Sequence, residues 1–92
     1  MKVKIHVTPT HIENGEPEEP SLCPIALACI DAGFSRPDIC VDEMIVTCGK
    51  TGEKYCMEEP PKKAQDFITR FDNKEKVNPF SFILNLEKQG GL

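Results

Sequence analysis

The chain has 92 residues, of which 39% are hydrophobic and 28% charged, as is ordinary for one small globular domain. Its formal net charge of −4 argues against a general nucleic-acid-binding surface, because such a surface needs a basic stripe to displace counterions. The first residues, MKVKIHV, lack the apolar core of a secretory leader, and no apolar run approaches the ~20 residues that span a bilayer. We therefore expect a single domain, residues 1–92, in a reducing cytoplasm and without a membrane partner.

The first expected element is a strand over residues 2–8. Valine and isoleucine alternate there with lysine and histidine, which is the period-two pattern of a strand with one buried face. Thr10 and Glu13 then have the spacing of a capping box, which predicts a single helical turn broken at Asn14-Gly15. An acidic, proline-containing loop follows.

The least polar stretch of the chain, SLCPIALACIDAG, predicts a short central helix over residues 24–32. Pro24 suits the first helical position, where its missing N–H is not needed. Gly33 suits the position just past the helix, where a left-handed residue is favoured. Because the residues between them are almost all apolar, we expect this helix to be enclosed on most sides.

A hairpin is expected after the central helix. Residues 34–38 are interpreted as a connection to a second strand over residues 39–48, whose alternation is interrupted at Asp42-Glu43. A bulge and a short break both explain that interruption. A glycine-containing turn then leads to a third strand over residues 53–57.

The last third of the chain predicts one helix and one strand. The helix is expected over residues 61–72, because apolar residues recur there at the spacing of a single helix face. A strand over residues 79–86 follows, and the polar end, residues 87–92, is expected to be a frayed tail. The order strand, helix, strand, strand, helix, strand predicts an α+β fold. We expect a two-layer sandwich in which two helices cover one face of a mainly antiparallel four-stranded sheet.

The other face of the predicted sheet has no helix to cover it. The residues that fall on it are Lys4, His6, Ser81 and Ile83. A chain of this size buries only about 60–65% of its unfolded surface, so its stability is marginal. An exposed sheet face in such a domain often becomes a subunit contact, and we therefore expect a homo-oligomer.

Five cysteines are an odd number and cannot all pair within one chain, so we interpret them as mostly buried free thiols. They lack the Cys-x2-Cys spacing of a zinc knuckle, and neither a metal nor another cofactor is expected. Cys23 would lie beside the N-cap of the central helix, where the helix dipole lowers the pKa of a thiol. The alternative is a small residue that closes the start of the helix without any chemistry.

Two short motifs resemble functional sequences without their required partners. Gly49-Lys50-Thr51 resembles the end of a phosphate loop, but the glycine needed five residues earlier is replaced by Met44, so a hairpin turn is expected. His6-Val7-Thr8 resembles half of a two-histidine phosphoesterase site, and the sequence has no second half.

Lys62 and Lys63 stand in the first turn of the second helix, where a cation is disfavoured by about 0.3–1 kcal/mol. Compensation by neighbouring glutamates on a solvated surface is one explanation. The other is an anion site, in which free backbone N–H groups and both lysines converge on a phosphate. Arg36 and Lys50 would contribute if the fold or a neighbouring subunit brings them close, and Cys23 completes the set of candidate ligand-binding residues.

Several motifs together carry a resemblance to known sequences. They are Cys23-Pro24-Ile25-Ala26-Leu27-Ala28, preceded by Val7-Thr8-x-x-His11-Ile12 and followed by Phe67-Ile68-x-x-Phe71-Asp72 and Val77-x-Pro79-Phe80-x-Phe82. On these residues the chain resembles a family of short, uncharacterised proteins associated with bacteriophage and prophage genomes. The motifs occupy core, cap and turn positions, so the resemblance brings no catalytic residues. In size and acidity the chain is similar to the sponges that sequester nucleotide-derived immune signals in anti-Thoeris and anti-CBASS counter-defence.

These observations lead to three functional hypotheses. The first is a non-catalytic counter-defence protein that captures a small anionic, nucleotide-derived signal in the cytoplasm of an infected bacterium. The second is an interaction module that inhibits a host protein through the acidic loop of residues 13–19 and the open sheet face. The third is a cysteine-dependent enzyme centred on Cys23.

Overall fold

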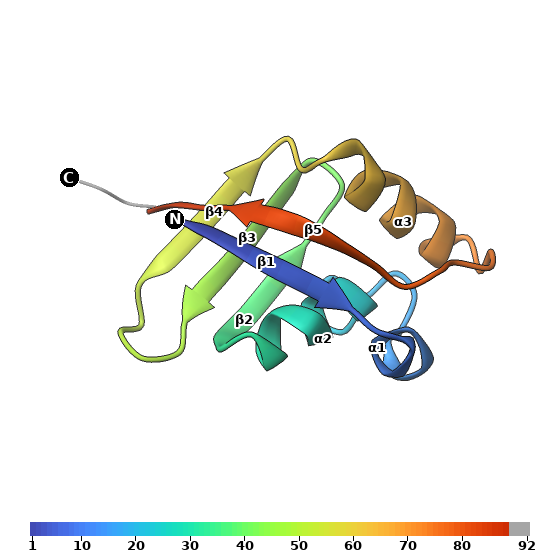
Figure 1. Ribbon diagram of the computed structural model, residues 1–92, viewed down its shortest axis with the longest axis horizontal. Coiled ribbons are helices and arrows are strands. Elements are labelled where there is room, and N and C mark those ends of the chain that lie inside the picture. The colour runs from blue at the N-terminus through green and yellow to red at the C-terminus, as the bar shows by residue number, and fades with distance from the viewer. Residues whose placement is uncertain (89–92) are drawn as a thin grey trace.

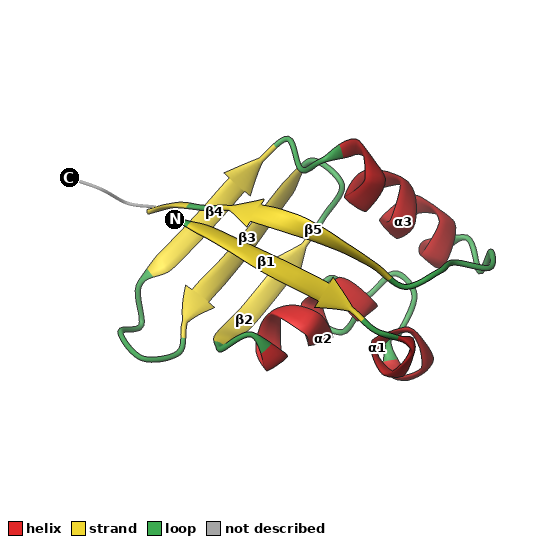
Figure 2. Ribbon diagram, viewed as in Figure 1, coloured by secondary structure: helices red, strands yellow, loops and turns green. Residues whose placement is uncertain are grey.

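The computed structural model describes residues 1–88, in which three helices and six strands form an α+β fold (Figure 1, Figure 2). The elements, in chain order, are β1 (Lys2–Val7), α1 (Pro9–Asn14), α2 (Pro24–Asp31), β2 (Phe34–Ile39), β3 (Glu43–Cys48), β4 (Lys54–Glu58), α3 (Lys62–Asp72), β5 (Phe80–Asn85) and β6 (Glu87–Lys88). The α+β class is confirmed. The predicted two helices on one four-stranded sheet match this arrangement only roughly.

The strands form two antiparallel sheets instead of one. β1 pairs with β5, and the second sheet has the order β2-β3-β4-β6. Leu86 separates β5 from β6, so the chain passes there from one sheet to the other: Asn85 pairs with Lys2, and Glu87 pairs with Cys56. The two sheets cross in Figure 1, with β1 and β5 in front of the other strands.

The prediction missed β2, which was expected to be a connection. Arg36 adopts a φ of 48°, and the register with β3 shifts between Ser35 and Asp38, which is the behaviour of a β-bulge. The bulge places three residues on the buried face: Phe34, Pro37 and Ile39. Proline is tolerated at a bulge because its missing N–H is not required for pairing there. The extended backbone expected for Arg36-Pro37 therefore belongs to a strand.

The long strand expected over residues 39–48 is interrupted by a tight turn. The Cys40 N–H donates to the Glu43 carbonyl oxygen at 2.9 Å, and β3 begins only at Glu43. The break near Asp42, one of two explanations for the imperfect alternation, is therefore the correct one. The hairpin of β3 and β4 is confirmed, with pairs running from Glu43 opposite Glu58 to Thr47 opposite Lys54.

Helix α1 starts earlier than predicted, because its N-cap is Thr8 and not Thr10. The Thr8 hydroxyl accepts from the His11 N–H at 3.3 Å, and the Thr8 N–H donates to His11 Nδ1 at 3.0 Å. Since a backbone N–H can only donate, the ring proton lies on Nε2, which donates to Asp31 Oδ2 at 2.6 Å. The capping box uses histidine where glutamate was sought, and the same side chain ties α1 to the end of α2.

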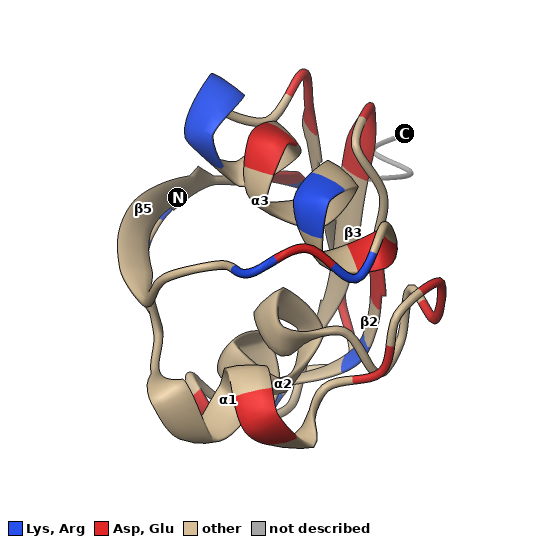
Figure 3. Cartoon of the chain, turned by 90° about the vertical axis from the view of Figure 1, so that its right-hand side faces the viewer, with Lys and Arg blue, Asp and Glu red and all other residues tan. Residues whose placement is uncertain are grey.

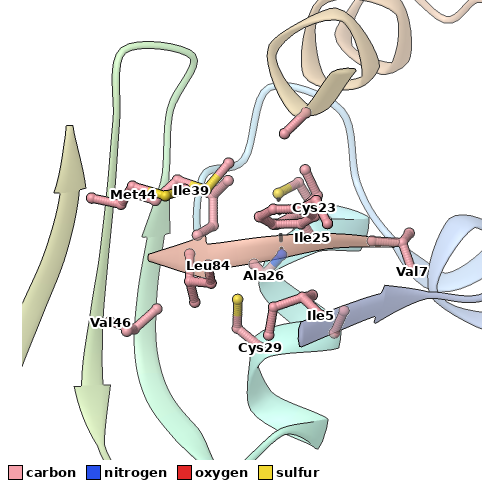
Figure 4. Packing of buried hydrophobic residues seen from close by; sticks show 14 of the residues in the cluster. Ile5, Val7, Cys23, Ile25, Ala26, Cys29, Ile39, Met44, Val46 and Leu84 are labelled. Carbon is pink, nitrogen blue, oxygen red and sulfur yellow. Dashed lines mark hydrogen bonds between the residues drawn. The ribbon is translucent and has the colours of Figure 1, made fainter. Parts of the chain in front are cut away.

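The two predicted helices are present, and both contribute to one buried cluster between the sheets (Figure 4). Helix α2 begins at Pro24, and Gly33 just beyond it has a φ of 103°. Its enclosure is less complete than expected, because Ile30 is 46% exposed. Figure 4 shows Cys29 of α2 between Ile5 of β1 on one side and Val46 of β3 on the other, with Leu84 of β5 nearby.

No other segment of residues 1–88 covers the face of the β1–β5 sheet that points away from this cluster. Lys4, His6 and Ile83 are exposed on it, and Ser81, half-buried, has its hydroxyl 2.8 Å from His6 Nδ1. This agrees with the predicted open face.

The predicted tail begins as an ordered strand. Glu87 and Lys88 pair with β4, Lys88 forms an ion pair with Glu53, and the Leu86 N–H donates to the Met1 carbonyl oxygen at 2.7 Å. The prediction of a frayed tail is therefore wrong for residues 87–88, because Leu86 is buried and anchors the segment. Residues 89–92 of that prediction lie outside the described residues. Among the helices of residues 1–88, none combines the length and apolar character that a membrane crossing requires.

Candidate functional site

Cys23 occupies the predicted position at the N-cap of α2, but its environment opposes the predicted reactivity. Its Sγ accepts a hydrogen bond from the Ala26 N–H at 3.4 Å. Burial raises the pKa of the Cys23 thiol to about 11, so the predicted lowering by the helix dipole is wrong in direction. The thiol lines a cleft of about 260 Å³ together with the carboxylates of Glu18, Glu19 and Asp72. These charges disfavour an anion beside Cys23, and a thiol kept protonated is a weak nucleophile.

Arg36 and Lys50 do not lie near the start of α3 within one chain. Lys50 is in the turn beyond the Thr47–Lys54 pair, whereas α3 follows the opposite end of β4. Arg36 is exposed on β2, which β3 separates from β4. A contribution from either residue through a neighbouring subunit stays a prediction.

Lys62 is compensated within its own helix. Its Nζ lies 3.2 Å from Asp66 Oδ1, one turn further along α3, and both side chains are exposed. Exposed pairs of this type contribute about 0.3–0.5 kcal/mol. The compensation therefore comes from Asp66 and not from the glutamates considered in the sequence. The N-cap of α3 is Pro61, which offers no side-chain cap.

Lys63 lies in a different setting, because it lines a cleft between α3 and the segment that leads into β5. One wall comes from Lys63, Asp66, Phe67 and Arg70, which share a helix face, and the other comes from residues 76–80. The volume of this cleft, hereafter the α3 cleft, is about 270 Å³. Ligand pockets are typically about 300–1,000 Å³, so the α3 cleft suits a small group such as a phosphate with part of a nucleoside.

The α3 cleft is locally basic on a chain whose net charge is −4. Lys63, Arg70 and Lys76 line it with a single carboxylate, Asp66, which already pairs with Lys62. Figure 3 shows the basic segments of α3 and of the loop after it on the same side of the molecule. An arginine fork and two lysines are the groups that proteins use to hold phosphate and carboxylate groups.

The floor of the α3 cleft is apolar and largely aromatic. The rings of Phe67 and Phe80 lie with their centroids 4.8 Å apart and are tilted by 32°. Val77 and Pro79 complete this surface. Such a floor fits the flat, apolar face of a base or another ring while charged groups at the rim fix its anionic part.

Sequence reasoning identified Lys63 but not the other cations of the cleft. Arg70 and Lys76 were not among the predicted ligand-binding residues. The spacing of seven residues between Lys63 and Arg70 places both on one helix face, and that signal was readable in the sequence. The position of Lys76 was not readable, because it depends on the packing of Phe80 against α3.

Cys48 is the cysteine whose surroundings favour the thiolate. Hydrogen bonding from the Thr51 side chain, and then from the backbone of Thr51 and Lys50, lowers the pKa of the Cys48 thiol. Burial instead raises the pKa of Cys29 to about 12. In residues 1–88, no three His, Cys, Asp or Glu side chains converge as a metal ion would require.

The α3 cleft is therefore the best candidate site, and its lining groups are suited to binding. They offer cations and apolar surface, without the paired nucleophile and base that covalent chemistry needs. Comparisons of the chain with protein-family models, with curated proteins and with solved structures gave no match.

Proposed function

We propose that this protein binds and sequesters a small anionic, nucleotide-like ligand in the α3 cleft and does not transform it. The observation that supports the proposal is the convergence of Lys63, Arg70 and Lys76 around an apolar floor on an otherwise acidic chain. A role in phage counter-defence, inside an infected bacterial cell, comes from the sequence resemblance and belongs to the same proposal.

Charge supplies the first part of the binding energy. All three cationic side chains are exposed, so each is hydrated and mobile in the free protein. A phosphate between them would order them, and the pairing of Asp66 with Lys62 reduces the repulsion from the carboxylate that lines the cleft. Arg70 would hold two phosphate oxygens at once, whereas each lysine would act as a point charge.

The aromatic floor supplies the second part. Phe80 is only half-buried, and although Phe67 and Phe82 both pack on its ring, part of the ring remains for a ligand. Stacking of a ligand ring on an aromatic side chain adds roughly 1–3 kcal/mol. A ligand with both a phosphate and a flat ring therefore fits the cleft better than inorganic phosphate.

Titration calorimetry tests this proposal directly. The ligands are inorganic phosphate, a nucleoside monophosphate, cyclic nucleotides and ADP-ribose-type nucleotides. We expect at least one nucleotide to bind more tightly than phosphate and to be recovered intact from the complex by mass spectrometry. Arg70→Gln and Lys76→Gln should each weaken that binding about tenfold. Lys54→Gln is the matched control, because it removes the same charge from β4, outside the cleft.

Two results would contradict binding in the α3 cleft. One is the absence of heat with every ligand in the panel. The other is binding that Arg70→Gln and Lys76→Gln leave unchanged, which would place the ligand elsewhere. Recovery of a cleaved ligand would show that the protein is an enzyme and would refute the non-catalytic part.

One observation favours the alternative of an interaction module. The acidic loop ends at the cleft beside Cys23, where Glu18, Glu19 and Asp72 surround apolar groups that include the exposed Val41. Carboxylates around an apolar patch fit a basic, partly apolar side chain of a partner protein. A host protein retained by the wild-type chain and lost with Glu18→Lys plus Glu19→Lys would support this alternative; equal retention by both would argue against it.

A further inference from the structure

A second, larger groove lies along the uncovered face of the β1–β5 sheet. Its volume is about 860 Å³, and it runs between the outer face of that sheet and the end of β4 together with the segment that follows. We call it the β5 groove. It is separate from the α3 cleft, with which it shares no lining residue.

Charge is distributed across the β5 groove in two opposed walls. Lys2 and Lys4 of β1 form a cationic wall, and Glu58, Glu59 and Glu87 form an acidic wall. Strand β5 lies between them: it pairs with β1 on one side, and the Asn85 N–H donates to Met57 Sδ of β4, at 3.2 Å, on the other. In Figure 1, β5 is drawn between β1 and the end of β4.

The floor between the walls carries an exposed apolar side chain. Ile83 lies directly opposite Lys4 in the β1–β5 register and is 45% exposed. It is one of few large apolar residues exposed in residues 1–88, and the outer face of β1–β5 is where it lies.

The charges of the two walls do not pair with each other. The ion pairs found in residues 1–88 are His11–Asp31, Lys62–Asp66 and Lys88–Glu53, and no residue of either wall takes part in them. The groove therefore presents separate rows of opposite charge, on either side of an apolar centre. A complementary partner must present the same three features in the reverse order.

We infer that the β5 groove is the contact surface of a homodimer of this chain. A two-fold axis that runs along β5 through the region of Ile83 turns the cationic wall of one copy onto the acidic wall of the other, and does so twice. It also brings the two Ile83 side chains together, which removes both from water. About this axis a second copy presents its charges in the required reversed order, whereas an unrelated partner would need a separate surface with that order. The inference specifies the surface of the expected oligomer and does not rest on anion binding.

The test is the oligomeric state of charge-reversed variants, measured by sedimentation velocity on untagged protein over a wide concentration range. Lys2→Glu plus Lys4→Glu, and separately Glu58→Lys plus Glu59→Lys, should each weaken the dimer about tenfold or more, because both symmetric contacts become repulsive. Mixing the two variants should restore a dimer, since each acidic groove then meets a basic one. Added salt should weaken the wild-type dimer.

A matched control separates charge effects at the groove from a change in net charge. Lys50→Glu plus Lys54→Glu makes the same two reversals in and beside the β3–β4 turn, away from the groove, and should leave the dimer unchanged. Circular dichroism of every variant establishes that it is folded. A wild-type protein that is monomeric at all concentrations overturns the inference. So does a dimer that both groove variants leave intact, or one that the mixture fails to restore.

Discussion

His11 provides the sharpest test of how the chain's first half is held together. Its imidazole ring is almost buried, with 9% of the side chain exposed, and it makes contacts in two directions. Nδ1 accepts from the Thr8 N–H at the start of α1, and Nε2 donates to Asp31 at the end of α2. The change His11→Ala removes both contacts and the ring at once.

The expected cost follows from these contacts. The hydrogen bond from Thr8 contributes about 1 kcal/mol, because its loss leaves a half-buried N–H without a partner. The bond to Asp31 contributes less than a buried charged bond would, since that carboxylate is 72% exposed. Burial of the ring adds about 1 kcal/mol. We therefore expect His11→Ala to lower the free energy of unfolding by about 2–3 kcal/mol.

Urea denaturation at neutral pH measures this change, and thermal unfolding should show a fall in Tm of roughly 8–20 °C for a domain of this size. Asp31→Asn is the control, because an amide oxygen still accepts from Nε2; its cost should be below about 1 kcal/mol. A loss for His11→Ala no larger than that for Asp31→Asn would refute the structural role assigned to this ring.

Three further predictions concern other parts of the chain. Gly15→Ala should destabilise the protein by about 1–3 kcal/mol in the same urea assay, because the added methyl group would lie 2.6 Å from the proline ring that opens α2. Iodoacetamide should alkylate Cys48 well before Cys23, since hydrogen bonds lower the pKa of the Cys48 thiol and burial raises the pKa of the Cys23 thiol to about 11. Peptide mass spectrometry gives the order of labelling, and faster labelling of Cys23 would contradict this prediction. The Lys88 ammonium holds the pKa of the Glu53 carboxyl below its usual range. This pair therefore stabilises the fold at pH values above the unfolded-state pKa of about 4.3. The stabilisation is lost as the pH falls through the lower folded-state pKa. Lys88→Gln should remove that part of the acid sensitivity, and an identical pH profile for both proteins would count against the pair.

Several elements were predictable because their signals act over a few residues. The period-two patterns of β1 and β5, the apolar stripe of α3, and the bracketing of α2 by Pro24 and Gly33 all predicted the observed structure. The cap of α1 was misplaced by two residues because histidine takes a role sought for glutamate. Strand β2 was missed because a bulge at Arg36 shifts its alternation by one position, and a strict period-two pattern does not anticipate that shift.

The candidate sites depend on contacts that no local pattern carries. Lys63 and Arg70 share a helix face by their spacing alone, but Lys76 joins them only because Phe80 packs against Phe67. The β5 groove exists because the chain turns at Leu86 from one sheet into the other. Local sequence therefore determined the positions of β1, α2, α3 and β5, since those preferences arise within a turn or a pleat. The folded chain alone decided which charges face one another, since that depends on the packing of segments far apart in the sequence.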